Sequence, residues 1–119
     1  MPWKLSSDRP IWLQLQEQLK LQILAGKYAS GERFPSVRDL ASEAAVNPNT
    51  MQKALAALEQ DGLLIGSRTN GRTVTTDESL LLSMRDQIAE QLFQELENSL
   101  KELGYSEDEI KIAIMKKYQ

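Results

Sequence analysis

Neither cysteine nor histidine occurs in this sequence of 119 residues. Without cysteine the chain has no disulfide and no thiol nucleophile, and without histidine it lacks the commonest general base. Ordinary zinc sites are excluded as well, because they are built from these two residue types. Carboxylates are plentiful, but no pair of them stands among groups that would shift a pKa, and no glycine-rich phosphate loop is present. We therefore expect no metal, no cofactor and no enzymatic activity.

Long hydrophobic runs and aromatic residues are also scarce. Apolar runs such as residues 63–65 and 80–82 are far shorter than the roughly 20 residues that cross a bilayer. The first ten residues, MPWKLSSDRP, do not follow the pattern of a secretory signal. Two Trp, three Tyr and two Phe are too few to predict the exposed aromatic platform that binds single-stranded RNA. We expect a soluble intracellular protein without a membrane partner.

The charge of the sequence is unevenly distributed. Residues 1–75 hold nine Lys and Arg against seven Asp and Glu, whereas residues 76–119 hold five against ten. The two parts therefore carry net charges of +2 and −5. A partner with phosphate groups would prefer the first part. Because such an asymmetry is common in soluble proteins, charge alone does not identify the partner.

Helical periodicity predicts three helices in the first part. The first spans roughly residues 10–25, with Pro10 at its first position. The second is short and starts at Ser36, whose side chain can cap it. The third covers about residues 48–60 and takes Asn47 as its cap. Its aliphatic residues face inward and leave a polar outer side, formed by Asn49, Gln52, Lys53 and Ala56.

A β-hairpin is predicted after the third helix, over about residues 64–75. A short apolar run precedes the turn, and a segment that alternates in the manner of a strand follows it. Between them, Asn70-Gly71 is a strong signal for a two-residue turn, since both residues tolerate positive φ. We expect two strands with a basic tip, with Arg68 on one arm and Arg72 on the other.

Two further helices are predicted in the second part. A long helix from Asp77 to about Gly104 has apolar residues at every third or fourth position, and it has too little of its own chain to bury them. A short apolar helix starts at Ser106, with Glu109 placed for a capping box. We expect this surface to form a homodimer interface; the alternative is a tail that folds back on its own domain. The predicted interface residues are Leu81, Met84, Ile88, Leu92, Leu96, Leu100, Ile110 and Ile114.

Two short helices joined by a tight turn and followed by a basic hairpin predict a winged helix-turn-helix. The third helix would enter the major groove of DNA, where Gln52 can pair with adenine and Lys53 can reach guanine or a phosphate. Taken singly, each signal has a plainer explanation, such as a helix start, a solvated face, an ion pair or an ordinary turn. Their order and spacing favour DNA binding. The predicted DNA-binding residues are Ser36, Arg38, Asn47, Asn49, Thr50, Gln52, Lys53, Arg68, Asn70, Gly71 and Arg72.

The string FPSVRDLASEAAVNPNTMQKALAALEQDGLL, followed by GSRTNGRTVT, resembles the winged helix-turn-helix of the GntR transcription regulators. The segment NPNTMQKAL at residues 47–55 and the tail with its LGYSEDE are similar to the small YtrA subfamily. This resemblance extends from Pro10 to about Tyr118 and implies a bacterial cytoplasmic protein whose tail pairs two subunits. It also implies operator contacts from the wing tip and from Arg38, Asn49, Thr50, Gln52 and Lys53.

Three positions depart from the family pattern. Ala45 stands in the helix–helix turn where glycine is usual, and a positive φ there would cost alanine on the order of 1 kcal/mol. The wing tip reads TNGR at residues 69–72 where Gly-x-Gly is usual. Of the DNA contacts that the resemblance implies, those of the wing tip are therefore the least supported. Thr73 replaces a common aromatic residue, which is expected to loosen the packing of the wing.

The sequence thus predicts a mainly α-helical fold with a small β-hairpin, divided into a DNA-binding domain (1–76) and a helical dimerisation tail (77–119). The expected function is that of a homodimeric repressor on an inverted-repeat operator, with half-sites about 10 bp or a multiple of that apart. The alternative is a winged-helix protein–protein interaction module without specific DNA binding. Any small-molecule effector would bind at the dimer interface or between tail and DNA-binding domain, since few residues follow the wing.

Overall fold

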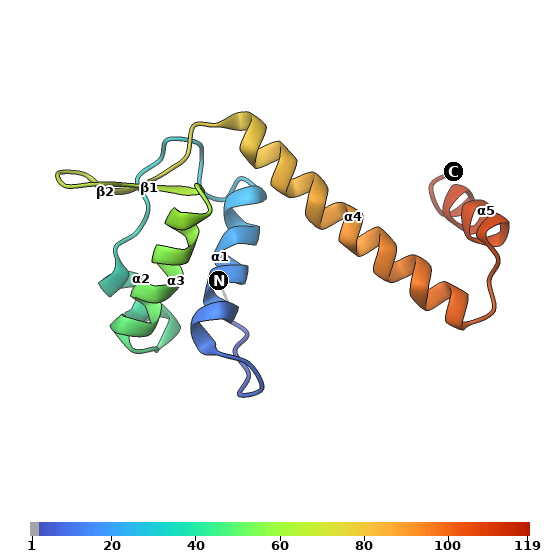
Figure 1. Ribbon diagram of the computed structural model, residues 1–119, viewed down its shortest axis with the longest axis horizontal. Helices are drawn as coiled ribbons and strands as arrows, with labels where there is room; N and C mark the ends of the chain where they lie inside the picture. The colour runs from blue at the N-terminus through green and yellow to red at the C-terminus, as the bar shows by residue number, and fades with distance from the viewer. Residues whose placement is uncertain (1–2) are drawn as a thin grey trace. The chain divides into compact units, whose positions relative to one another are not determined.

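The computed structural model describes residues 3–119 and contains five helices and one hairpin (Figure 1). This confirms the predicted fold class. By its internal contacts the chain forms a first compact unit that ends at Leu82 and a second unit from Ser83 to Gln119. The division falls inside the fourth helix, and the functional boundary expected after residue 76 stays a prediction. The elements are α1 (Ile11–Leu24), α2 (Val37–Ala44), α3 (Pro48–Gln60), β1 (Leu64–Ser67), β2 (Gly71–Val74), α4 (Glu78–Glu102) and α5 (Glu107–Lys117).

The core of the first unit lies where α1 and α2 pack against α3. Aliphatic side chains at helical spacing meet there, and the hairpin closes one end of the core with Leu64 and Val74. Burying each such side chain contributes about 1.5–3 kcal/mol. This core fixes which side of α3 remains in solvent. The largest fully buried side chains are Leu15, Leu19, Leu40, Met51, Leu55, Leu58, Leu63, Leu64 and Val74.

Two glutamines of α1 attach the N-terminal segment to the helix. The Gln14 side chain accepts from the Ser6 N–H (2.8 Å) and donates to the Ser6 carbonyl (2.9 Å). One helical turn later, Gln18 makes the same pair of bonds with the backbone of Lys4. Pro10 is the N-cap of α1, with φ −54° and ψ 134°, and not its first helical residue as predicted. The helix therefore begins one residue later, at Ile11.

The turn between α2 and α3 contains an alanine in a left-handed conformation. Ala45 caps α2 with φ 56° and ψ 47°, and it is the sole non-glycine residue with positive φ among residues 3–119. The predicted caps of both helices are present: Ser36 Oγ accepts from the Asp39 N–H (3.1 Å), and Asn47 Oδ1 accepts from the Asn49 N–H (2.7 Å). Local capping therefore determines where both helices begin.

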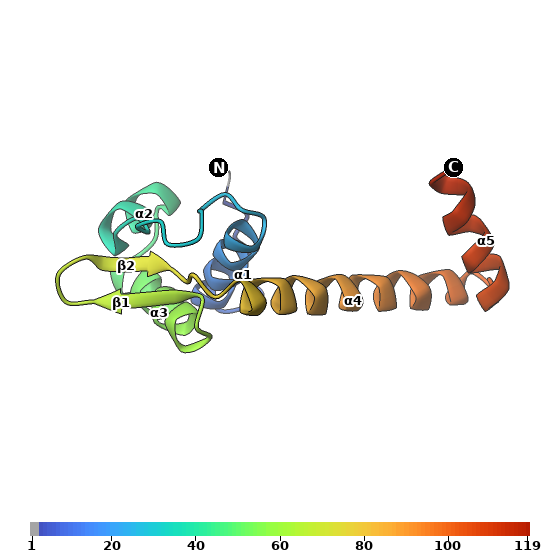
Figure 2. The ribbon, with the colours of Figure 1, turned by 90° about the horizontal axis from the view of Figure 1, so that it is seen from above.

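The hairpin pairs β1 with β2 in antiparallel register, with Leu64 opposite Val74 and Ser67 opposite Gly71. Figure 2 shows it projecting beyond the helices of the first unit. The predicted two-residue turn is wrong: three residues connect the strands, and of the expected pair only Gly71 has positive φ, at 66°. The Ser67 hydroxyl instead organises the tip by accepting from the N–H groups of Thr69 and Asn70, both at 3.3 Å.

A preceding segment lies along the free edge of β2. The Phe34 N–H donates to the Arg72 carbonyl (2.8 Å), and the Val74 N–H donates to the Glu32 carbonyl (2.9 Å). An isolated antiparallel bridge joins Arg33 to Thr73. This pairing satisfies the outer edge of the hairpin and brings the start of α2 close to β2.

The tail helices have well-formed ends but little buried surface. Ser106 and Glu109 make the predicted capping box of α5. None of the α4 residues, all of which lie in the described part of the chain, is buried, whereas Ile110 of α5 is. Within residues 3–119, no helix is long and apolar enough to cross a membrane.

Candidate nucleic-acid interface

The outer face of α3 is polar and fully accessible. Met51, Leu55 and Leu58 are buried on the inner side, and Asn49, Gln52, Lys53 and Ala56 are exposed, as the sequence predicted. At about 100° per residue, Asn49 and Ala56 lie at the centre of this face. Gln52 lies toward one edge of the face and Lys53 toward the other. A helix with such an exposed polar face has the dimensions to enter the major groove of DNA.

The backbone N–H groups at the start of α3 are already bonded within the chain. Asn49 N–H donates to the Asn47 side chain, and the N–H groups of Thr50 and Met51 donate to the Asn47 carbonyl at 3.0 and 3.1 Å. Pro48 has no N–H group. These backbone N–H groups are therefore not free to donate to a phosphate. The side chains of Asn49 and Thr50 and the positive end of the helix dipole remain available to bind one.

The start of α2 and the first residues of β2 together line a hollow of about 210 Å³. It brings together three of the predicted DNA-binding residues, Ser36, Gly71 and Arg72, although they are far apart in the sequence. Arg33 lines the same hollow and was not predicted. Its signal in the sequence, a basic residue three positions before a helix cap, is too common to identify it. Arg38 is exposed on the first turn of α2.

The two arginines of the wing have different environments. Arg68 is exposed in the loop that joins the strands. Arg72 is folded back on α3: its Nε donates to Glu59 Oε1, and its side chain is only 18% exposed. A Cβ added to Gly66 would lie 3.1 Å from Glu59 Oε2, so the strand approaches this carboxylate closely. Glu59 therefore joins the wing to α3, a role that the sequence analysis missed.

The opposite edge of α3 is bordered by α1. Lys53 Nζ lies 4.7 Å from the centroid of the Trp12 ring, within the range of a cation–π contact. Further along the same helices, Gln16 Nε2 donates to Asp61 Oδ2 (3.2 Å). The outer face of α3 is thus bordered by the wing on the Gln52 side and by α1 on the Lys53 side. Trp12, like Glu59, could not be found from spacing, because both contacts are tertiary.

The predicted dimer residues differ in exposure. Ile110 is buried within its own chain at 7% exposure, and Leu92 and Leu96 are exposed at 59% and 46%. The remaining five, Leu81, Met84, Ile88, Leu100 and Ile114, are half-buried. Several large apolar residues that the prediction omitted are also exposed; they are Leu82, Phe93, Leu103, Ile112, Met115 and Tyr118.

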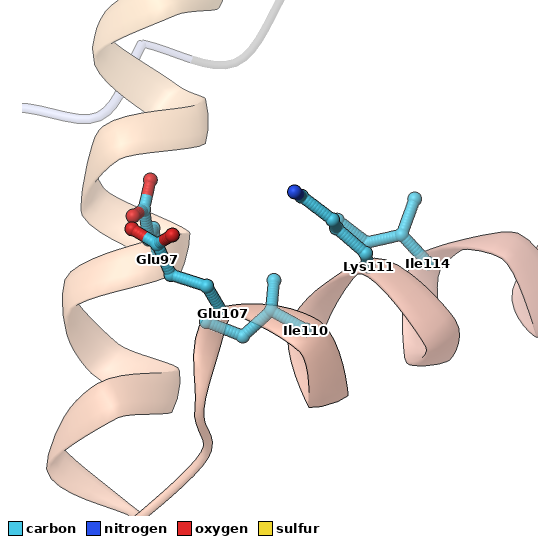
Figure 3. A pocket seen from close by; sticks show the side chains of 5 residues that line it. All are labelled: Glu97, Glu107, Ile110, Lys111 and Ile114. Carbon is cyan, nitrogen blue, oxygen red and sulfur yellow. The ribbon is translucent and has the colours of Figure 1, made fainter.

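A hollow of about 340 Å³ lies between the end of α4 and α5 in the second unit (Figure 3). Its apolar wall is formed by Ile110 and Ile114, and its rim carries Glu97, Glu107 and Lys111. The Lys101 ammonium contacts both carboxylates, at 2.9 Å from Glu97 and 3.7 Å from Glu107. The hydrogen bond to Glu97 is the main cause that raises the pKa of Lys101. The pair with Glu97 lies within α4, and the pair with Glu107 attaches the start of α5 to α4.

Known proteins share both the sequence pattern and this fold. The profile of the family described as "Bacterial regulatory proteins, gntR family" matches residues 12–74. The HTH-type transcriptional repressor YtrA of Bacillus subtilis (strain 168) is 36% identical over 90 residues, covering 74% of this chain and 69% of the repressor. A GntR family transcriptional regulator from Listeria monocytogenes superposes with a TM-score of 0.84 at 29% identity, over 94% of this chain and 98% of that one. The DNA-binding domain of AraR in complex with operator ORR3 gives a TM-score of 0.52 at 25% identity, over 63% and 93%.

Proposed function

The chain belongs to the GntR family of DNA-binding transcription regulators and to its YtrA subfamily, and on that basis we propose that it is a homodimeric repressor of an inverted-repeat operator. The observation that carries the proposal is the presence of two uncovered surfaces with different chemistry. One is the polar outer face of α3 with the adjacent wing, and the other is the apolar surface of α4 and α5.

The DNA-binding unit would place α3 in the major groove. Gln52 would form two hydrogen bonds with adenine, and Lys53 would donate to guanine or to a phosphate. Side chains at the starts of α2 and α3 would fix the orientation of α3 through phosphates rather than bases. We assign Ser36, Arg38, Asn47, Asn49 and Thr50 to this group. The wing would add contacts to the backbone or minor groove through Arg68, Asn70, Gly71 and Arg72.

The second copy of the chain would bind to the apolar surface of the tail. Leu92, Phe93 and Leu96 expose about half or more of their surface. Burying this apolar surface against a partner would stabilise the complex by about 25 cal/mol for every square ångström removed from water. A helix of 25 residues with so little covered surface requires a partner. A two-fold axis through the tails would place two α3 helices on one face of the duplex, at half-sites about 10 bp or a multiple of that apart.

Such a dimer would repress transcription from a promoter that overlaps its operator. The bound dimer would exclude RNA polymerase from that promoter, and this would need no further protein surface. The relative at 36% identity is a repressor by name. Pairing also supplies the avidity that a unit with a net charge of only +2 lacks.

The oligomeric state tests the proposal with a matched pair of variants. We expect the wild-type chain to sediment as a dimer at micromolar concentration and Leu96→Glu to sediment as a folded monomer, because a carboxylate cannot be buried in an apolar interface. Leu21→Glu is the control, since Leu21 is similarly exposed (52%) but lies on α1. A strictly monomeric wild type, or a Leu96→Glu variant that remains dimeric, would contradict the proposal.

A further inference from the structure

Trp12 and Lys53 form a pair beside the outer face of α3. The Lys53 ammonium lies over the indole at 4.7 Å from the ring centroid. Trp12 is half-buried near the start of α1, and Lys53 is exposed on α3. Because the face of an aromatic ring is electronegative, a cation within about 6 Å of the centroid is attracted to it. The ring therefore favours one direction for a side chain that would otherwise be free in solvent.

The contact matters because lysine is flexible. A lysine has four rotatable bonds, so an exposed ammonium samples a wide volume and contacts phosphates in many geometries. A base edge, in contrast, accepts a hydrogen bond only from a donor in a narrow range of positions. An ammonium has three N–H donors, and resting on a ring face leaves others free to donate elsewhere. The contact is therefore compatible with binding to DNA.

The other edge of the same face is also fixed. Glu59 lies seven residues after Gln52, on the same side of α3, and it binds Arg72 of the wing. Glu59 therefore holds the wing against α3 about two turns after Gln52, and Trp12 lies beside Lys53. A single aromatic residue on α1 determines the geometry of one of the two side chains expected to read bases.

We propose that Trp12 is a specificity-determining residue that positions Lys53 for one base edge in the major groove. The inference rests on the proposed function, since it assigns a base contact to Lys53. Trp12 itself needs no contact with DNA. The competing explanation is that Trp12 only fills space between α1 and α3, in which case its ring face is irrelevant to Lys53.

The pair can be tested first without DNA. In a Trp3→Phe background Trp12 is the one remaining tryptophan, so ring-current shifts from an indole come from it alone. We expect the side-chain methylene protons of Lys53 to resonate upfield of those of Lys27, an exposed lysine after the end of α1. Trp12→Leu should abolish the difference. Lys53 protons at ordinary positions in the Trp3→Phe protein would overturn the proposal.

The second test is a double-mutant cycle on a duplex selected by the wild-type protein from random DNA. Cation–π contacts at exposed sites correspond to about a two- to fivefold change in an equilibrium constant. We expect Trp12→Leu to weaken binding to the selected duplex by this factor and to reduce the preference at the base pair where Lys53→Ala also reduces it. In the Lys53→Ala background, Trp12→Leu should have no further effect.

Two controls separate positioning from packing. Trp12→Phe keeps a ring face and should retain the base preference, and Lys27→Ala removes one positive charge and should leave that preference unchanged. Equal losses from Trp12→Leu with and without Lys53, or an equal loss on all duplexes, would overturn the proposal. If the wild-type protein selects no duplex, the proposed function itself fails, whereas the ring-current measurement still decides whether the pair exists.

Discussion

Replacing Ala45 by glycine should stabilise this protein, although the same change destabilises the interior of a helix. Ala45 has φ 56° and ψ 47°, where its Cβ is too close to the following carbonyl oxygen. Relief of this strain contributes about 1–2 kcal/mol. Glycine also has more conformational freedom in the unfolded chain than alanine, and losing this freedom on folding costs about 0.5–1 kcal/mol. The Ala45 side chain is exposed, so no packing is lost.

The net expectation is a stabilisation of up to about 1.5 kcal/mol, centred at about 0.75 kcal/mol, which is equivalent to roughly 3–5 °C in Tm for a domain of this size. Denaturant unfolding and calorimetry of Ala45→Gly against the wild type would measure it. The matched control is Ala25→Gly, because Ala25 is also exposed and also caps a helix, but with φ −77° in the right-handed region. This control should lose about 0.5–1 kcal/mol.

The test is whether the free energy of unfolding changes in opposite directions in Ala45→Gly and Ala25→Gly. If Ala45→Gly is destabilised as much as Ala25→Gly, the strain assigned to the turn between α2 and α3 does not exist. Operator affinity should be unchanged in Ala45→Gly, since the substitution preserves the angle between these helices.

Three further predictions concern the DNA-binding face and the start of α4. Gln52→Ala and Lys53→Ala should each weaken binding to the selected operator by about 1–3 kcal/mol while leaving bulk DNA binding nearly unchanged; a uniform loss on all sequences would assign these side chains to phosphates. Glu59→Gln should remove the ion pair with Arg72 and make the backbone amides of the wing exchange several times faster. The control Glu17→Gln removes the exposed ion pair with Arg9 and should leave exchange in the wing unchanged. Unchanged exchange in Glu59→Gln would refute a role for Glu59 in holding the wing. The pKa of Asp77 is lowered by hydrogen bonds from the Ser79 hydroxyl and the Leu80 N–H, so its stabilisation of α4 is complete above the ordinary pKa and is lost as pH falls through the lowered one. The protection of the Leu80 amide, taken relative to its intrinsic exchange rate at each pH, should therefore fall in that acidic range in the wild type and should already be low at neutral pH in Asp77→Ala; equal protection of Leu80 in the two proteins at neutral pH would refute this role.

The helices could be predicted because their signals are local. Ser36 and Asn47 cap α2 and α3 in the structure as expected, and Ser106 with Glu109 caps α5. The spacing of the aliphatic residues in α3 predicted which side chains are exposed. Each of these features depends on residues within about one turn of each other.

Features that depend on tertiary contacts were not predicted. Asn70 has no positive φ, because the Ser67 hydroxyl organises a three-residue tip in place of the two-residue turn. The pairs Trp12–Lys53 and Glu59–Arg72 join elements whose relative position is set by the core. Ile110 faces its own chain, although periodicity gave it the same status as Ile114. A helical pattern identifies an apolar side but not what covers it.

Selection of duplexes from a random pool by the purified protein tests the central claim most directly. We expect enrichment of an inverted repeat whose half-site centres lie about 10 bp or a multiple of that apart. Absence of any enriched sequence over bulk competitor at moderate salt, or enrichment of a single unrepeated half-site, would contradict it.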